Sequence, residues 1–146
     1  NVIPNFVYWS MLGESLPLTG DGEETRDFTY VLDLVQGLIK SAYYQEAVGQ
    51  AFNLASGKET KIKDLISKIN NATGNKKPIT KYPPRKWDTK KRLLASIELA
   101  RKLIDYNPLG LFDDGLKENI DWFNNNWDKI RETADFPIGM SSAVRK

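Results

Sequence analysis

Apolar residues recur at helical spacing along most of the chain. Residues 31–44 and 62–69 each follow the i, i+3, i+4, i+7 pattern that turns one face of a helix toward a core. Thr60 stands where it would cap the second of these helices. Three further helices are predicted at residues 2–12, at residues 97–104 with Ser96 as the cap, and in a final element whose apolar face comprises Leu116, Ile120, Phe123, Trp127 and Ile130.

Four short segments have the composition of strands, namely residues 16–19, 26–31, 51–55 and 78–82. Pro17 restricts the first of them to a sheet edge. The third is apolar apart from Asn53 and runs into Ser56-Gly57, which is typical of a buried strand in a parallel sheet. Because the other strands are too short to flank it, we expect residues 51–55 to join a sheet whose other strands lie outside this chain. The element order predicts a mixed α/β fold.

Composition narrows the chemistry. The chain of 146 residues contains no Cys and no His, which excludes disulfides, thiolate or imidazole metal sites, and a histidine base. Acid–base catalysis would fall to carboxylates, Lys, Tyr or Arg. We see neither a signal peptide nor an apolar run of the roughly 18–20 residues that a membrane span needs. The first residue is Asn, so we expect a processed or trimmed piece of a longer polypeptide.

Positive charge is concentrated in one segment. Between Lys76 and Arg92, eight of the chain's 21 basic residues stand beside one of its 19 acidic residues. This pattern fits three interpretations: a solvated charged loop, a site for a phosphate-bearing small ligand, or a nucleic-acid surface on which Trp87 stacks with bases.

Several apparent motifs fail on physical grounds. Tyr82 and Lys86 have the Tyr-x-x-x-Lys spacing of a dehydrogenase pair, but the two prolines between them exclude a regular helix. The segment Gly20-Asp21-Gly22 lacks the third glycine of a dinucleotide fingerprint and is predicted to be a turn. The acidic pairs Glu23-Glu24 and Asp113-Asp114 are interpreted as turn and helix-entry charges.

Three blocks occur in a familiar order: residues 16–34, which include Arg26-Asp27-Phe28, residues 52–57, and residues 84–88. Together they closely resemble the C-terminal portion of NAD-dependent nucleotide-sugar epimerases and dehydratases, the extended short-chain dehydrogenase/reductases typified by UDP-glucose 4-epimerase. The resemblance implies that residues 1–30 and 57–146 form the lobe that binds the nucleotide sugar. It implies that residues 31–56 supply one helix and one strand to a dinucleotide-binding (Rossmann) domain absent from this chain.

The resemblance also implies a set of substrate contacts. Two arginines would hold the nucleotide diphosphate, an aspartate would lie near the ribose, and two residues would line the uracil pocket. In that order these are Arg26 and Arg85, Asp88, and Pro17 with Thr19, while Asn1 would contact the ligand and Asn53 a phosphate. Phe28 stands where some relatives have Tyr, so a hydroxyl contact is lost there.

The intact enzyme implied by the resemblance is cytoplasmic and homo-oligomeric, and it uses NAD to oxidise a hydroxyl of a UDP-type sugar. The family's glycine-rich loop and its catalytic Tyr and Lys would lie upstream of residue 1. We therefore expect no catalytic residue, no metal and no bound NAD in this chain, and no activity from it alone. Neither a membrane nor a nucleic acid is an expected partner.

Two other functions remain open at this stage. The chain would be a stand-alone binding module if residues 76–92 contact nucleic acid, or a non-catalytic sensor of nucleotide sugars if the lobe has lost its enzyme. The sugar, the base and the choice among epimerase, dehydratase and decarboxylase stay open as well.

Overall fold

A computed structural model describes residues 2–84 and 89–133. The chain divides into two compact units, whose described residues we treat separately. Unit 1 comprises Asn1–Glu23, Lys61–Thr89 and Leu116–Lys146, and unit 2 comprises Glu24–Thr60 and Lys90–Gly115. No helix in the described part of the chain has the length and apolar character of a membrane span.

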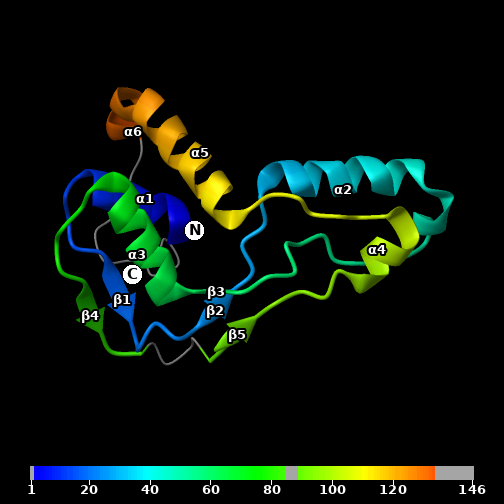
Figure 1. The fold of residues 1–146 in the computed structure, drawn as a ribbon, viewed down its shortest axis with the longest axis horizontal. Coiled ribbons are helices and arrows are strands. Elements are labelled where there is room, and N and C mark those ends of the chain that lie inside the picture. Colours follow the sequence, from blue (N-terminus) through cyan, green and yellow to red (C-terminus); the bar gives the residue numbers. More distant parts are fainter. Residues whose placement is uncertain (1, 85–88, 134–146) are drawn as a thin grey trace. The chain divides into compact units, whose positions relative to one another are not determined.

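In unit 1, α1 (Val2–Met11) packs against α3 (Ile62–Thr73), as Figure 1 shows. The core of this unit is apolar, and its fully buried side chains include Val7, Leu16, Leu65, Ile66 and Ile69. One polar contact joins the two helices, where the buried Ser10 hydroxyl lies 2.9 Å from the Asn70 amide oxygen and 2.6 Å from the Thr73 hydroxyl. Burial of one stripe on α3 is what its apolar spacing predicts.

Unit 1 also contains a two-stranded parallel sheet of β1 (Pro17–Thr19) and β4 (Thr80–Tyr82). Pro17 pairs with Thr80 and Thr19 with Tyr82, so each strand has a free edge. This fits Pro17, which has no N–H to donate. The two glycines of the turn after β1, Gly20 and Gly22, have φ of 75° and 76°, which confirms the predicted turn.

In unit 2, β2 (Thr25–Arg26) occupies the middle of a three-stranded sheet, between β3 (Thr60–Lys61) and β5 (Arg92–Leu93). The pairing of β2 with β5 is parallel. Helix α2 (Val31–Tyr43) packs on α4 (Glu98–Ile104), and the 3₁₀ turn η1 (Gln45–Ala47) lies beside both. The core of this unit surrounds Tyr106, whose buried hydroxyl donates to the Ala55 carbonyl at 3.1 Å.

The final apolar stripe forms two helices, α5 (Phe112–Asn125) and α6 (Trp127–Thr133), where the sequence predicted one element. The break falls at Asn126, whose side-chain amide donates back to the Trp122 carbonyl at 2.8 Å. Asn competes for backbone groups in this way and so interrupts helices. The predicted buried face is confirmed at Leu116, Ile120, Phe123 and Ile130.

Residues 51–55 form no strand with the described residues, and because the predicted sheet partners lie outside this chain, the strand stays a prediction. A strand needs a neighbour for its N–H and C=O groups, and an apolar run cannot reveal whether one exists. The strand predicted at 26–31 is shorter and covers only Thr25–Arg26. Neither predicted cap forms, because Lys61 and Ile97 occupy the N-cap positions and no side chain caps either helix.

The helices at 2–12, 31–44 and 62–73, the strands at β1 and β4, and the α/β class are confirmed. The left-handed Asp105, with φ of 50°, ends α4 before Pro108 is reached. Tyr82 lies in β4, a strand, whereas Lys86, its partner in the rejected Tyr-x-x-x-Lys pair, lies outside the described residues.

Candidate functional site

Arg26 lies at the end of the central strand β2 and is half-buried. Its Nη1 donates to the Thr25 carbonyl at 2.8 Å, so the guanidinium contacts the backbone of its own strand. Backbone N–H groups on both sides of it are bonded to β5 and to the residue before that strand. Thr25 N donates to the Lys91 carbonyl and Asp27 N to the Leu93 carbonyl, each at 2.9 Å. The backbone that carries this cation is therefore fixed in a parallel ladder.

Asp27 joins β2 to the turn at residues 56–57. Its Oδ1 accepts from the Ser56 backbone N–H at 3.0 Å and from the Ser56 hydroxyl at 2.5 Å, while Oδ2 accepts from Gly57 N at 3.1 Å. Gly57 has φ of 68°, and a Cβ there would lie 3.1 Å from Ile97 Cδ1. The turn thus needs glycine, and its two N–H groups hold one carboxylate.

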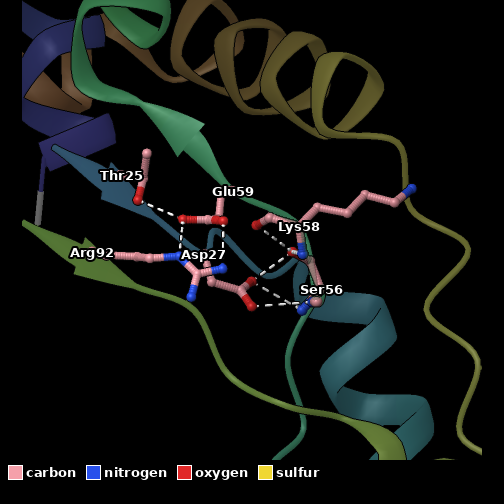
Figure 2. A network of polar contacts seen from close by, with 7 residues as sticks. Thr25, Asp27, Ser56, Lys58, Glu59 and Arg92 are labelled. Carbon is pink, nitrogen blue, oxygen red and sulfur yellow. Dashed lines mark hydrogen bonds and ion pairs between the residues drawn. The ribbon is translucent and has the colours of Figure 1, made fainter. Parts of the chain in front are cut away.

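The side chain of Glu59 connects β2 to β5, as Figure 2 shows. Arg92 donates to it from both Nε and Nη2, each at 2.8 Å, in the two-pronged geometry that suits a carboxylate. The Thr25 hydroxyl donates to Oε1 of the same carboxylate at 2.7 Å. The hydrogen bonds from Arg92 and then from Thr25 lower the pKa of Glu59, so this group stays ionised below the usual range of a glutamate.

Arg92 belongs to the basic segment that the sequence singled out, and its charge is engaged by Glu59. The pair is exposed: the side chain of Arg92 retains 66% of its accessible surface. At least this member of the basic run serves the sheet of its own unit. The pair gives Arg92 a contact within its own sheet, and the three interpretations of residues 76–92 stay open.

Three other predicted contacts lie within the described residues. Asn53 is exposed, and its amide donates to the Ser96 carbonyl at 3.3 Å. Pro17 and Thr19 are half-buried and share one face of β1, because the buried Leu18 between them faces the other way. Arg26 and Asn53 belong to unit 2, whereas Pro17 and Thr19 belong to unit 1. The roles of all four stay predictions.

The remaining predicted contacts, Asn1, Arg85 and Asp88, lie outside the described residues. Phe28, which lacks the hydroxyl of some relatives, packs its ring against Phe112 with centroids 5.7 Å apart. This aromatic contact explains how the position is used within unit 2 without a hydroxyl.

Sequence reasoning missed the acidic residues that organise this region. Asp27 and Ser56-Gly57 both fell within recognised blocks, but nothing in the spacing of 29 residues indicated that they bond to each other. Asp33 was missed too: it is buried, and its two oxygens accept from the backbone N–H groups of Leu109 and Gly110 at 2.9 Å each. Asp33 lies off the apolar stripe in the first turn of the helix, where acids are common, so nothing in the sequence signalled its burial.

The described residues offer little to a metal or a dinucleotide. Residues 2–84 and 89–133 contain no group of three or more Asp, Glu, His or Cys side chains arranged to hold a metal ion. The Gly20–Gly22 turn leads into β2, whereas a dinucleotide fingerprint leads from a strand into a helix. These glycines therefore do not fit NAD.

Comparison with known proteins identifies consistent similarities. Residues 1–55 match the model of the NAD dependent epimerase/dehydratase family. A UDP-N-acetyl-alpha-D-glucosaminuronate decarboxylase from Bacillus cytotoxicus is 29% identical over 127 residues, which cover 84% of this chain and 39% of the decarboxylase.

Two solved structures are similar over nearly the whole chain. Epimerase Mth375 from Methanothermobacter thermautotrophicus has a TM-score of 0.88 and 47% identity, over 91% of this chain and 40% of the epimerase. WbmF from Bordetella bronchiseptica, solved in complex with NAD+ and UDP, has a TM-score of 0.77 and 40% identity, over 90% of this chain and 38% of its own. The chain thus spans about two fifths of the length of the proteins that it matches.

Proposed function

We propose that this chain, which belongs to the NAD-dependent epimerase/dehydratase family, holds the diphosphate of a UDP-type sugar for an enzyme that acts on nucleotide sugars. The observation that carries the proposal is the position of Arg26. It is a half-buried arginine at the end of a central parallel strand, in a chain 40% identical to a protein solved with UDP. Arg85, in the basic segment, is the proposed second contact to the diphosphate.

Arginine suits this role for a geometric reason. A guanidinium donates in a planar fork that matches two phosphate oxygens, and it remains charged at every physiological pH. Two such groups from separate segments would bind both phosphates while leaving the sugar free to present either face. Binding energy from the remote diphosphate then holds the reacting carbon in place.

We assign the redox step to the part of the related proteins that this chain does not cover. NAD bound there would supply reversible hydride transfer to the enzyme. Residues of this chain bind and orient the nucleotide, and the chain alone is proposed to be inactive. Which sugar is bound, and whether the product is an epimer or an eliminated or decarboxylated sugar, is decided by residues outside it.

The division of labour also concerns residues 31–56. Helix α2 leaves large apolar side chains exposed, among them Val31, Leu32, Leu38 and Ile39. Residues 51–55 follow it and pair with no strand among the described residues. We propose that this helix and segment complete the dinucleotide-binding domain, as the resemblance to the family implies.

Titration calorimetry with UDP tests the proposal directly. We expect the chain to bind UDP, and Arg26→Ala and Arg85→Ala each to weaken binding about tenfold or more, as loss of a charge-assisted hydrogen bond predicts. Arg101→Ala is the matched control, because Arg101 is an exposed arginine of α4 whose Nη1 bonds to Glu98, and it should leave the affinity unchanged.

A second titration with a short oligonucleotide addresses the alternative. Binding of the oligonucleotide with a steep salt dependence, together with indifference to UDP, would establish a nucleic-acid module and overturn the proposal. Binding of UDP that ignores both arginines would contradict the assigned contacts.

A further inference from the structure

We infer that Asp27, Glu59 and Arg92 are positioning residues for Arg26: they fix the strand that carries this cation and keep the acidic groups beside it occupied. The inference rests on the proposed function of Arg26. It concerns residues that make no proposed contact with the ligand and act through their neighbours in the sheet.

The first step is the alternation of side chains along β2. Successive side chains of an extended strand point to opposite faces, so Thr25 and Asp27 leave β2 on the face opposite Arg26. Thr25 is held by Glu59 at 2.7 Å, and Asp27 is held by the Ser56-Gly57 turn through three hydrogen bonds. Both neighbours of Arg26 are therefore anchored through their side chains, and Figure 2 shows the hydrogen bonds that hold Thr25 and Asp27.

The second step is the link to the adjacent strand. Arg92 pairs with Thr25 in the register of β2 and β5, and Glu59 accepts from both residues. A single carboxylate thus joins β5 to β2 at the residue before Arg26. If Glu59 or Arg92 is removed, the side-chain link between β5 and Thr25 is lost. Only backbone hydrogen bonds then join β5 to β2.

The third step concerns charge. Asp27 is adjacent to Arg26 in the chain, and Glu59 is one hydrogen bond away from Thr25. An unpaired carboxylate in the same sheet would repel an anion held by Arg26, even from the opposite face. In this sheet the Glu59 carboxylate receives the Arg92 fork, and the Asp27 carboxylate receives two backbone N–H groups and a hydroxyl. Their negative charge is therefore satisfied by donors other than the ligand-binding cation.

Positioning and simple charge make opposite predictions for Glu59→Gln. If the sheet affected UDP only through its charge, removal of a negative group would strengthen the binding of an anion. If Glu59 positions Arg26, the same substitution weakens binding, because Gln cannot accept the Arg92 fork with two oxygens. We expect Glu59→Gln, Arg92→Gln and Asp27→Asn each to weaken binding of UDP by about fivefold.

The experiment is UDP titration of the full chain, with each substitution made alone and in an Arg26→Ala background at UDP concentrations up to the millimolar range. Glu98→Gln is the matched control, because Glu98 also pairs with an arginine of unit 2, at 2.9 Å, but within α4. A positioning role predicts that the effect of Glu59→Gln disappears in the Arg26→Ala background. Arg92→Lys should recover part of the affinity, because it keeps the charge without the fork.

Thermal unfolding of each variant separates positioning from loss of structure. An unchanged or strengthened affinity of folded Glu59→Gln, or a weakening of the same size with and without Arg26, would overturn the inference while leaving the role of Arg26 intact. No binding of UDP, or binding that ignores Arg26→Ala, would instead refute the proposed function on which the inference rests.

Discussion

Helices α2 and α3 carry the same apolar repeat and use it differently. In α3 the stripe is buried, and Leu65, Ile66 and Ile69 have no exposed surface. In α2 the large apolar residues face outward, with Leu38 56% and Ile39 63% exposed. What α2 buries instead is the acid Asp33 and the small Gly37. The pattern of a helix therefore predicts a face to be covered, but not which segment covers it.

The difference follows from where the partner of each helix lies. Helix α3 meets α1 within unit 1. Helix α2 contacts α4. The face of α2 that carries Gly37, which we call its narrow face, approaches the side chains of Leu54 and Tyr106. Its wide face, which carries the exposed Leu38 and Ile39, has the character of an interaction surface. Four changes test this contrast.

Truncation of a core residue in α3 should have the largest effect. Leu65→Ala is expected to lower the free energy of unfolding by about 2–5 kcal/mol, because it empties a fully buried site. Ile39→Ala in α2 should change it by no more than about 0.5 kcal/mol, since that side chain is exposed. Urea denaturation measures both, and similar losses for the two variants would contradict the contrast.

Addition of one methyl group to the narrow face of α2 comes next. A Cβ at Gly37 would lie 2.7 Å from Leu54 Cδ2 and 2.9 Å from Tyr106 Cε2. We expect Gly37→Ala to destabilise by about 1–3 kcal/mol through overpacking, even though alanine favours a helix. Urea denaturation of Gly37→Ala in a Leu54→Ala background is the control, because the extra space should reduce the cost. An equal cost in both backgrounds would place the strain elsewhere.

The wide face of α2 should cause copies of the chain to associate. We expect the chain to form dimers or larger species as its concentration rises, and Leu38→Glu to shift it toward monomer with little change in unfolding free energy. Sedimentation velocity measures the shift, and Ser67→Glu on the exposed side of α3 is the matched substitution. A wild-type chain that stays monomeric at high concentration would argue against an uncovered surface.

Acid should have the smallest effect, at the start of α3. Hydrogen bonds from Lys61 and then Lys63 lower the pKa of Glu23 from 4.5 to about 2. A lowered pKa means that the contribution of Glu23 to stability is present above pH 4.5 and is lost as the pH falls through about 2. The stability difference between wild type and Glu23→Gln, followed by urea denaturation on acidification, should shrink over that range. A constant difference would show that the carboxylate charge contributes nothing.

Local features of this fold could be predicted from sequence, and pairings could not. The spacing of Leu65, Ile66 and Ile69 predicted a helix and its buried face, because both depend on residues within three turns. The turn at Gly20–Gly22 was predicted for a similarly local reason. The strand predicted at residues 51–55 stays a prediction, because strand assignment depends on a neighbour that the segment does not contain.

The candidate site divides along the same line. Arg26 was identified from its block of residues, but the groups that hold it were not. Glu59 and Arg92 are 33 residues apart, and Arg92 had been grouped with the lysines of the basic segment. Only a tertiary arrangement brings a carboxylate to one of those cations, and no periodicity along the chain records it.

Asp33 has a consequence for the order in which the protein is made. Its carboxylate bonds to the backbone of Leu109, 76 residues later in the chain. At a synthesis rate of ~5–20 residues per second, the acid waits ~4–15 s for that partner to emerge. During this interval water solvates the carboxylate in place of the two backbone N–H groups. The first turn of α2 is therefore tied to this part of unit 2 only after residues 109 and 110 have been made.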